Sequence, residues 1–106
     1  MSWQITREDS VNVVALESEM GIQDAAGFHQ AVLPLAALDG AVRLDASAAT
    51  SVHTSIMQIL YALSQAVSDF GVSESSADFR AVEARVGFSL PRTKVTETPT
   101  NQAVPV

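Results

Sequence analysis

The sequence predicts an α/β fold in which a mixed, mostly parallel sheet is packed against helices. Short β-branched segments of strand length alternate with longer segments whose apolar residues recur at helical spacing. The resulting order is strand, strand, helix, strand, helix, strand, helix, and strand–helix–strand units build parallel sheets through right-handed crossovers. A chain of 106 residues supplies one modest core. We therefore expect one domain with about four to five strands and three main helices.

The first two strands are expected to form a hairpin. Residues 3–6 alternate apolar and polar side chains, as an edge strand does, and residues 7–10 are a polar turn. Residues 11–16 then form a β-branched strand with apolar side chains on both faces, which is typical of a central strand. Residues 17–21 leave this strand, and Gly21 permits a turn.

The first helix is expected to begin near Gln23 or Asp24, because an acidic side chain can cap a helix. Four apolar residues give it a stripe at helical spacing: Ala25, Phe28, Val32 and Leu35. Pro34 lacks an N–H group and clashes with the preceding turn. We therefore predict a kink or break near Leu33, with residues 39–40 ending the segment.

The second strand–helix unit comprises a strand at residues 41–44, a loop of small and hydroxyl residues, and a helix at residues 54–66. The helix has one apolar stripe: Ile56, Ile59, Leu60, Leu63 and Val67. Ser51, Thr54 and Ser55 lie where this helix begins, and backbone N–H groups there are unpaired. A hydroxyl group at this point can cap the helix, or it can accept a phosphate.

The last strand is expected at residues 70–74, although Gly71 interrupts it. Residues 75–78 resemble a capping box, and the third helix follows with a stripe of Phe79, Val82 and Val86. Gly87 is placed to end this helix, with Phe88 folding back on Val82. The domain is expected to span residues 1–90, followed by a disordered tail at residues 91–106, which are rich in Thr and Pro.

Composition excludes several functional classes. The net charge is −6 and the six basic residues are scattered, so no basic stripe exists to bind nucleic acid. No apolar run is long enough to insert into a bilayer, and the N-terminus lacks a basic leader and an apolar signal core. Without cysteine, disulfides and thiol catalysis are excluded. We expect a cytoplasmic protein.

Enzymatic chemistry is not expected. Asp45, His53 and Ser55 are the residue types of a hydrolase triad, but His53 and Ser55 are near neighbours at a helix start without a Gly-x-Ser-x-Gly context. No glycine-rich phosphate loop is present, and two histidines do not make a metal site. The prediction is a protein without catalytic residues, metal or cofactor.

The central strand–loop–helix resembles the core of the STAS domain, the fold of bacterial anti-sigma-factor antagonists. The segment Leu44-Asp45-Ala46-Ser47 matches the family's strand ending Leu-Asp-x-Ser. Residues 53–57 (HTSIM) stand where the family has Asp-Ser-Ser-Gly-Leu, with His53 in place of Asp and Ile56 in place of Gly. The resemblance covers roughly residues 11–90.

By this resemblance, Thr54 occupies the position of the serine that antagonists present to a partner kinase, and Ser55 is the hydroxyl residue after it. Both are candidate phosphoacceptors; in the alternative, Thr54 or Ser51 merely caps the helix. Asp45 and Ser47 are expected to support the loop. The expected partner-binding surface comprises Ser51, His53, Thr54, Ser55, Ile56, Met57 and Tyr61. In the alternative, Met57 and Tyr61, which are i, i+4 neighbours, only widen the core face of the helix.

Three functions follow from the resemblance. The first is a non-enzymatic bacterial signalling protein that binds a partner kinase or anti-sigma factor, or a chemotaxis kinase, and is switched by phosphorylation. The second is a STAS subunit that binds the ATPase of a phospholipid-transporting ABC complex; that subfamily often has Asp-Thr-Gly-Gly-Leu, which Thr54 fits and Ser55 and Ile56 do not. The third is an unswitched docking or scaffold domain, which needs an exposed apolar patch such as Ile56, Met57 and Tyr61. Partner, pathway and oligomeric state stay open.

Overall fold

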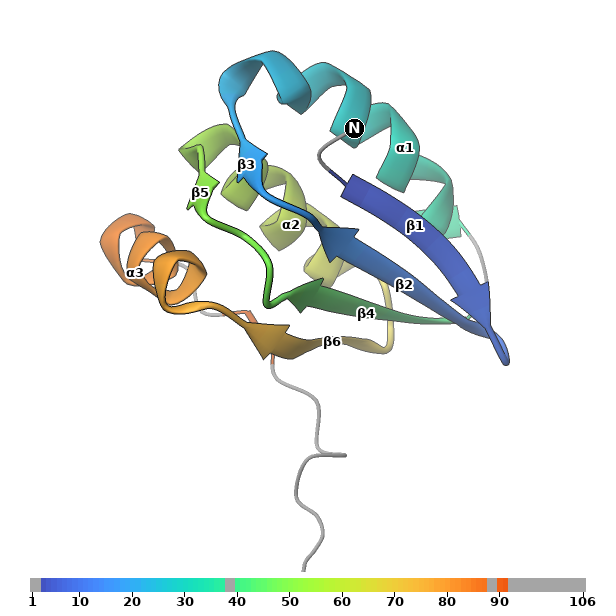
Figure 1. Ribbon diagram of the computed structural model, residues 1–106. Helices are drawn as coiled ribbons and strands as arrows, with labels where there is room; N and C mark the ends of the chain where they lie inside the picture. Colours follow the sequence, from blue (N-terminus) through green and yellow to red (C-terminus); the bar gives the residue numbers. More distant parts are fainter. Residues whose placement is uncertain (1–2, 38–39, 88–89, 92–106) are drawn as a thin grey trace, which may run out of the picture.

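A computed structural model of the protein describes residues 3–37, 40–87 and 90–91 (Figure 1). The elements in chain order are β1 (Trp3–Glu8), β2 (Val11–Leu16), β3 (Glu19–Met20), the short 3-10 helix η1 (Ile22–Asp24), α1 (Ala25–Ala37), β4 (Ala41–Ala46), β5 (Ser51–Val52), α2 (Thr54–Ala66), β6 (Phe70–Ser75) and α3 (Ala77–Val86). This order contains every strand and helix that the sequence predicts, together with two very short strands, β3 and β5, that it does not.

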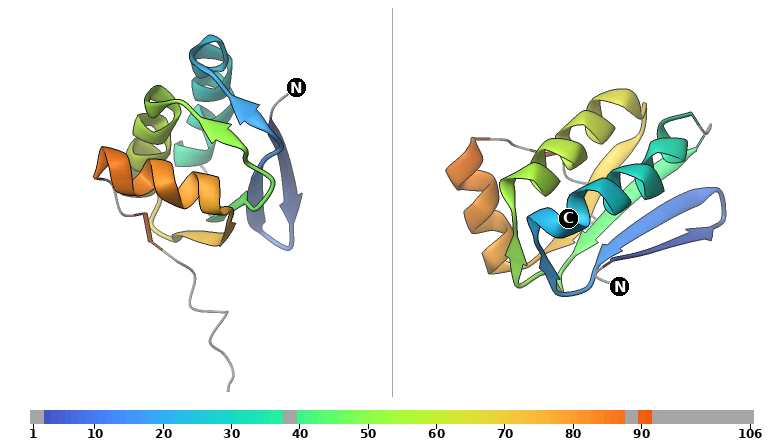
Figure 2. Two further views of the ribbon diagram at one scale, coloured as in Figure 1. Left: turned by 60° about the vertical axis from the view of Figure 1, so that its left-hand side comes forward. Right: turned by 90° about the horizontal axis from the view of Figure 1, so that it is seen from above.

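The main sheet has the strand order β1-β2-β4-β6. Strand β1 pairs with β2 antiparallel, whereas β2 with β4 and β4 with β6 are parallel pairs. Helices α1 and α2 lie side by side over one face of this sheet, and α3 lies beside β5 and α2 (Figures 1 and 2). The predicted α/β architecture with a mixed, mostly parallel sheet is therefore confirmed.

The core lies between the sheet and the two covering helices. Alternation along β2 and β4 directs Val14, Leu16, Val42 and Leu44 toward the helices, and each is at most 1% exposed. Helix α1 contributes Phe28, on which Trp3 of β1 packs edge to face with ring centroids 5.5 Å apart. Burying each large apolar side chain contributes about 1.5–3 kcal/mol. This apolar layer holds α1 and α2 on the sheet.

Helix α1 begins within a residue of its predicted start but is longer than predicted. The expected break near Leu33 is wrong, because the helix continues through Pro34 to Ala37. Pro34 lies near the helix end and removes a single N–H, while its neighbours Val32 and Leu35 are buried and hold the last turn on the sheet. At the start, Asp24 lies in η1 and accepts a hydrogen bond from the N–H of Gly21 at 2.9 Å. Residue 39, part of the predicted stop, lies outside the described residues.

The third helix ends as predicted. Gly87 has φ +81° at the C-cap, and its N–H donates to the carbonyl of Glu83; Phe88 lies outside the described residues. After the helix, the Glu83 carboxylate accepts a hydrogen bond from the N–H of Leu90 at 2.9 Å, and the carbonyl of Pro91 accepts one from Val72 at 2.8 Å. The chain is thus held on the domain as far as Pro91. The rest of the predicted disordered tail, residues 92–106, lies outside the described part.

Candidate functional site

The loop after β4 is shaped by the carboxylate of Asp45. Its Oδ1 accepts hydrogen bonds from the N–H of Ser47 at 3.0 Å and from Ser47 Oγ at 2.6 Å. A carboxylate that binds the backbone two residues onward closes a tight turn. These are the loop hydrogen bonds expected of Asp45 and Ser47, and they occur at the carboxyl end of β4.

A second set of contacts fixes the chain just before α2. Strand β5 pairs in parallel with β3, placing Glu19 opposite Ser51 and Met20 opposite Val52. The N–H of His53 donates to the carbonyl of Met20 at 2.8 Å. Sequence reasoning missed this small sheet, because two-residue strands carry no periodic pattern and form only through their pairing. It attaches His53, the residue before α2, to the backbone of β3.

Helix α2 begins at Thr54, as predicted, and its N-cap is His53. The imidazole Nδ1 accepts the N–H of Ser55 at 3.0 Å and lies 2.9 Å from Ser55 Oγ. Nδ1 is separated from the Cα by the same number of bonds as a carboxylate oxygen of Asp, so His53 caps the helix as Asp would. The alternative in which Thr54 or Ser51 caps α2 is wrong, since Ser51 lies in β5 and Thr54 is inside the helix.

The three hydroxyl residues of the predicted site are in different environments. Thr54 is exposed, and its hydroxyl makes no hydrogen bond with any residue that the structure describes. Ser55 is half-buried and its hydroxyl contacts His53. Ser51 is exposed on β5. Only Thr54 combines an accessible, unengaged hydroxyl with the first position of the helix.

The predicted apolar patch is only partly present. Ile56 and Met57 are both 0% exposed, so the expectation that their side chains form an exposed patch is wrong. The reason is geometric: the first turn of α2 already lies over the sheet, and these positions join the buried stripe that Leu60 and Leu63 continue. Tyr61, by contrast, is 39% exposed.

Ile22 was not identified from the sequence as an exposed apolar residue. Ile22 is 64% exposed and lies in η1, the short helix that follows β3 and contacts α2. In the sequence, Ile22 is a single apolar residue between the Gly21 turn and the polar residues Gln23 and Asp24. That pattern is only a weak indication of an exposed apolar side chain. Ile22 and Tyr61, rather than Ile56 and Met57, are therefore the exposed large apolar side chains of η1 and α2.

Within the described residues, no group of three or more His, Asp and Glu side chains is arranged to hold a metal ion. The helices in that part of the chain are too short or too polar to cross a membrane.

Comparison with known proteins gives a result at the level of the fold. No family model and no curated protein matches the sequence. Among solved structures, the chain is similar to an anti-sigma factor antagonist from Mycobacterium paratuberculosis, with a TM-score of 0.73 and 24% sequence identity. The match covers 86% of this chain and 85% of the other. The chain therefore has the fold of an anti-sigma factor antagonist, the STAS fold that the strand–loop–helix resemblance implied.

Proposed function

We propose that this protein is a non-enzymatic regulatory domain that binds a protein partner through the surface around the start of α2. Phosphorylation of Thr54 switches that binding. The observation that carries the proposal is the state of the Thr54 hydroxyl, which is exposed and unengaged at the first position of the helix while Ser55 is bound to His53. The likeness of the fold to an anti-sigma factor antagonist supports a partner of the anti-sigma-factor or kinase type.

A phosphate on Thr54 suits this position physically. It adds close to two negative charges, and the first N–H groups of a helix, together with its dipole, favour anions. The first turn of α2 contains no acidic residue to repel it. The domain therefore keeps its fold on phosphorylation, and the change falls on the partner, which meets new charge and volume.

Two exposed apolar side chains supply contact area for that partner. Tyr61 follows Thr54 by two helical turns and so lies on the same side of α2, and Ile22 lies on η1 against the same helix. Isolated exposed apolar residues are ordinary on protein surfaces. Together they give a partner apolar contact area on α2 and η1, and the exposed Thr54 hydroxyl gives it a group whose phosphorylation changes the contact.

The test is a comparison of three purified baits for capture from the native cell extract. These are the wild type, Thr54→Glu, and the matched control Thr6→Glu, whose residue is exposed on β1. We expect the wild type and Thr6→Glu to retain the same anti-sigma-factor or kinase-type partner and Thr54→Glu to lose it, as identified by mass spectrometry. The partner's retention by Thr54→Glu would contradict the switch.

Other partners would redirect the proposal. Capture of an ABC-transporter ATPase by the wild type would replace the signalling function with the transport function. If all three baits capture one partner equally, the protein is an unswitched docking domain. A chemotaxis scaffold would be one case of such a domain.

A further inference from the structure

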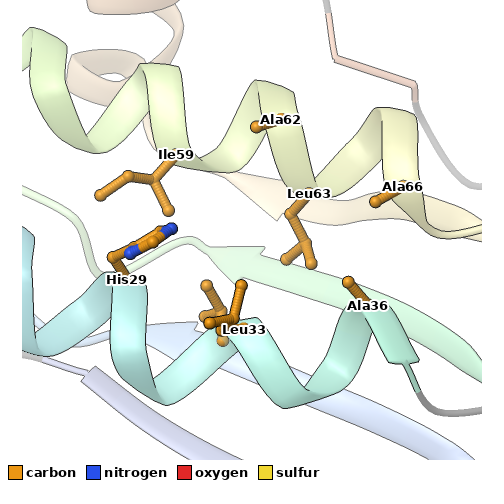
Figure 3. Close-up of a pocket in the computed structure, with 8 residues that line it drawn as sticks. His29, Leu33, Ala36, Ile59, Ala62, Leu63 and Ala66 are labelled. Atoms are coloured by element: carbon orange, nitrogen blue, oxygen red, sulfur yellow. The ribbon is translucent and has the colours of Figure 1, made fainter.

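A second surface, separate from Thr54, lies on the outer side of α1 and α2. The two helices leave an apolar groove between them, of about 150 Å³, which Figure 3 shows. Its walls include Leu33 and Ala36 of α1 and Ile59, Ala62 and Ala66 of α2. Leu33 is 56% exposed, so a large aliphatic side chain faces water at this groove. Thr54 does not line it.

The two helices are unusual in their charge. In the whole chain 17% of residues are charged, yet neither α1 nor α2 contains an Asp, Glu, Lys or Arg. Their exposed positions are instead occupied by uncharged residues, together with the titratable His29: Ala26, Gly27, Gln30, Leu33, Pro34, Ala37, Thr54, Gln58, Tyr61, Ala62, Gln65 and Ala66. Every charged residue of the chain therefore lies outside these two helices, with Asp24 of η1 directly before α1.

The groove is too small for a typical organic ligand, because such pockets measure about 300–1,000 Å³. It is of a size to receive a side chain of another protein. We propose that the occupant is a second copy of this chain, which packs its own α1–α2 face against this one, with the two Leu33 side chains entering the two grooves.

The distribution of charged residues favours a second copy of the chain over a partner that binds through charge. Two chains that each carry −6 repel one another, and the face on which they approach with least repulsion is the one without Asp or Glu. A twofold axis places the same face on both copies, so two surfaces without Asp, Glu, Lys or Arg meet, and the imidazole of His29 lines the groove. A partner that recognises its target by charge finds nothing to pair with on these helices.

The size of the face sets the expected strength. Each helix has 13 residues, which makes it about 20 Å long at about 1.5 Å per residue. Two such helices side by side give an interface at the small end of specific contacts, and weak association follows. Self-association is therefore expected at protein concentrations of roughly 0.1–1 mM.

The experiment is sedimentation equilibrium of the full chain across that concentration range, with two pairs of variants. Ala62→Glu in the groove is matched by Ala84→Glu, since Ala84 is an exposed alanine of α3. Leu33→Lys is matched by Ala84→Lys. We expect the wild type and both Ala84 variants to dimerise, and both groove variants to weaken the association at least tenfold. Leu33→Lys lowers the net negative charge, so its effect cannot come from general repulsion.

Salt provides an independent readout. Raising the salt concentration from about 0.1 to about 1 M shortens the Debye length from about 10 to about 3 Å, which weakens the repulsion between the copies and should strengthen this dimer. Three results would overturn the proposal. The wild type could stay monomeric throughout the concentration range, the groove variants could dimerise as well as their Ala84 controls, or added salt could dissociate the dimer. Circular dichroism confirms that each variant is folded, and Thr54→Glu should dimerise as the wild type does, which separates this proposal from the phosphorylation switch.

Discussion

Helices α2 and α3 both have a hydroxyl residue at or next to the N-cap, but within the described part of the chain only the hydroxyl at α3 makes hydrogen bonds. At α3, Ser76 Oγ accepts the N–H of Phe79 at 3.0 Å and donates to the carbonyl of Ala49 at 2.7 Å. Its hydroxyl is thus fully engaged in structure. At α2 the cap is the imidazole of His53, and the hydroxyl of the next residue, Thr54, is left exposed.

The N-terminus of α3 is also connected, through hydrogen bonds, to the loop that leads to the N-terminus of α2. The N–H of Ser76 donates to the carbonyl of Ala46 at 3.0 Å, so the start of α3 holds both ends of the short turn between Ala46 and Ala49. That turn leads to β5 and then to Thr54. The first turn of α3 contains acidic Asp78, whereas that of α2 contains no acidic residue. The hydroxyl at the start of α3 therefore supports the loop, whereas the Thr54 hydroxyl at the start of α2 stays exposed, where we propose that a partner contacts it.

The largest expected effect tests whether the first turn of α2 is core or surface. Ile56→Ala removes a fully buried side chain and should lower the free energy of unfolding by about 2–5 kcal/mol. Tyr61→Ala, at a partly exposed position on the same helix, should cost considerably less. Urea denaturation of both variants measures the difference, and equal losses would contradict the burial of Ile56.

The next effect concerns the support at α3. Ser76→Ala removes the cap and the hydrogen bond to Ala49, and the cap alone contributes about 0.5–2 kcal/mol. The exposed Ser68 provides the control, since Ser68→Ala should leave stability nearly unchanged. Thermal unfolding of the two variants makes the comparison. If Ser76→Ala is as stable as Ser68→Ala, the hydroxyl does not support the loop.

A smaller effect is expected at the cap of α2. His53→Ala should destabilise the protein by about 0.5–2 kcal/mol through loss of the acceptor for Ser55. His53→Asp keeps an acceptor at the same reach and should restore most of that stability. Chemical denaturation of the pair distinguishes a capping role from a packing role, because packing by the ring would not be rescued by Asp.

These comparisons also show what the sequence could supply. The bounds of α2 and the end of α3 were predictable, because a helical apolar stripe and a C-cap glycine act within a few residues. The pairing of β3 with β5 was not, since Met20 and Val52 meet only in the folded chain. Continuation of α1 through Pro34 was missed because burial of Val32 and Leu35 outweighs one lost hydrogen bond.

For the residues of the candidate site, the structure changes some of the predicted structural roles. Thr54 and the support from Asp45 followed from the motif, whereas the capping role of His53 did not, because histidine is an uncommon cap. Ile56 was predicted both in the apolar stripe of α2 and in the exposed patch, and its burial agrees with the stripe alone. Periodicity did not decide whether Met57 faces the core or a partner, and it is buried as well. Ile22 has no periodic neighbours, so only the folded structure shows its exposure beside α2.

The most direct test of the central claim is site-resolved mass spectrometry of the protein isolated from its native cells. Thr54 and Ser55 lie on one tryptic peptide, residues 44–80, because no Lys or Arg occurs between Arg43 and Arg80. Fragmentation between the two residues is therefore required, and the Thr54→Val variant serves as the control. The account predicts phosphate on Thr54 and its loss in Thr54→Val. Phosphate on Ser55 in place of Thr54, or an unmodified peptide under every growth condition in which the partner dissociates, would contradict it.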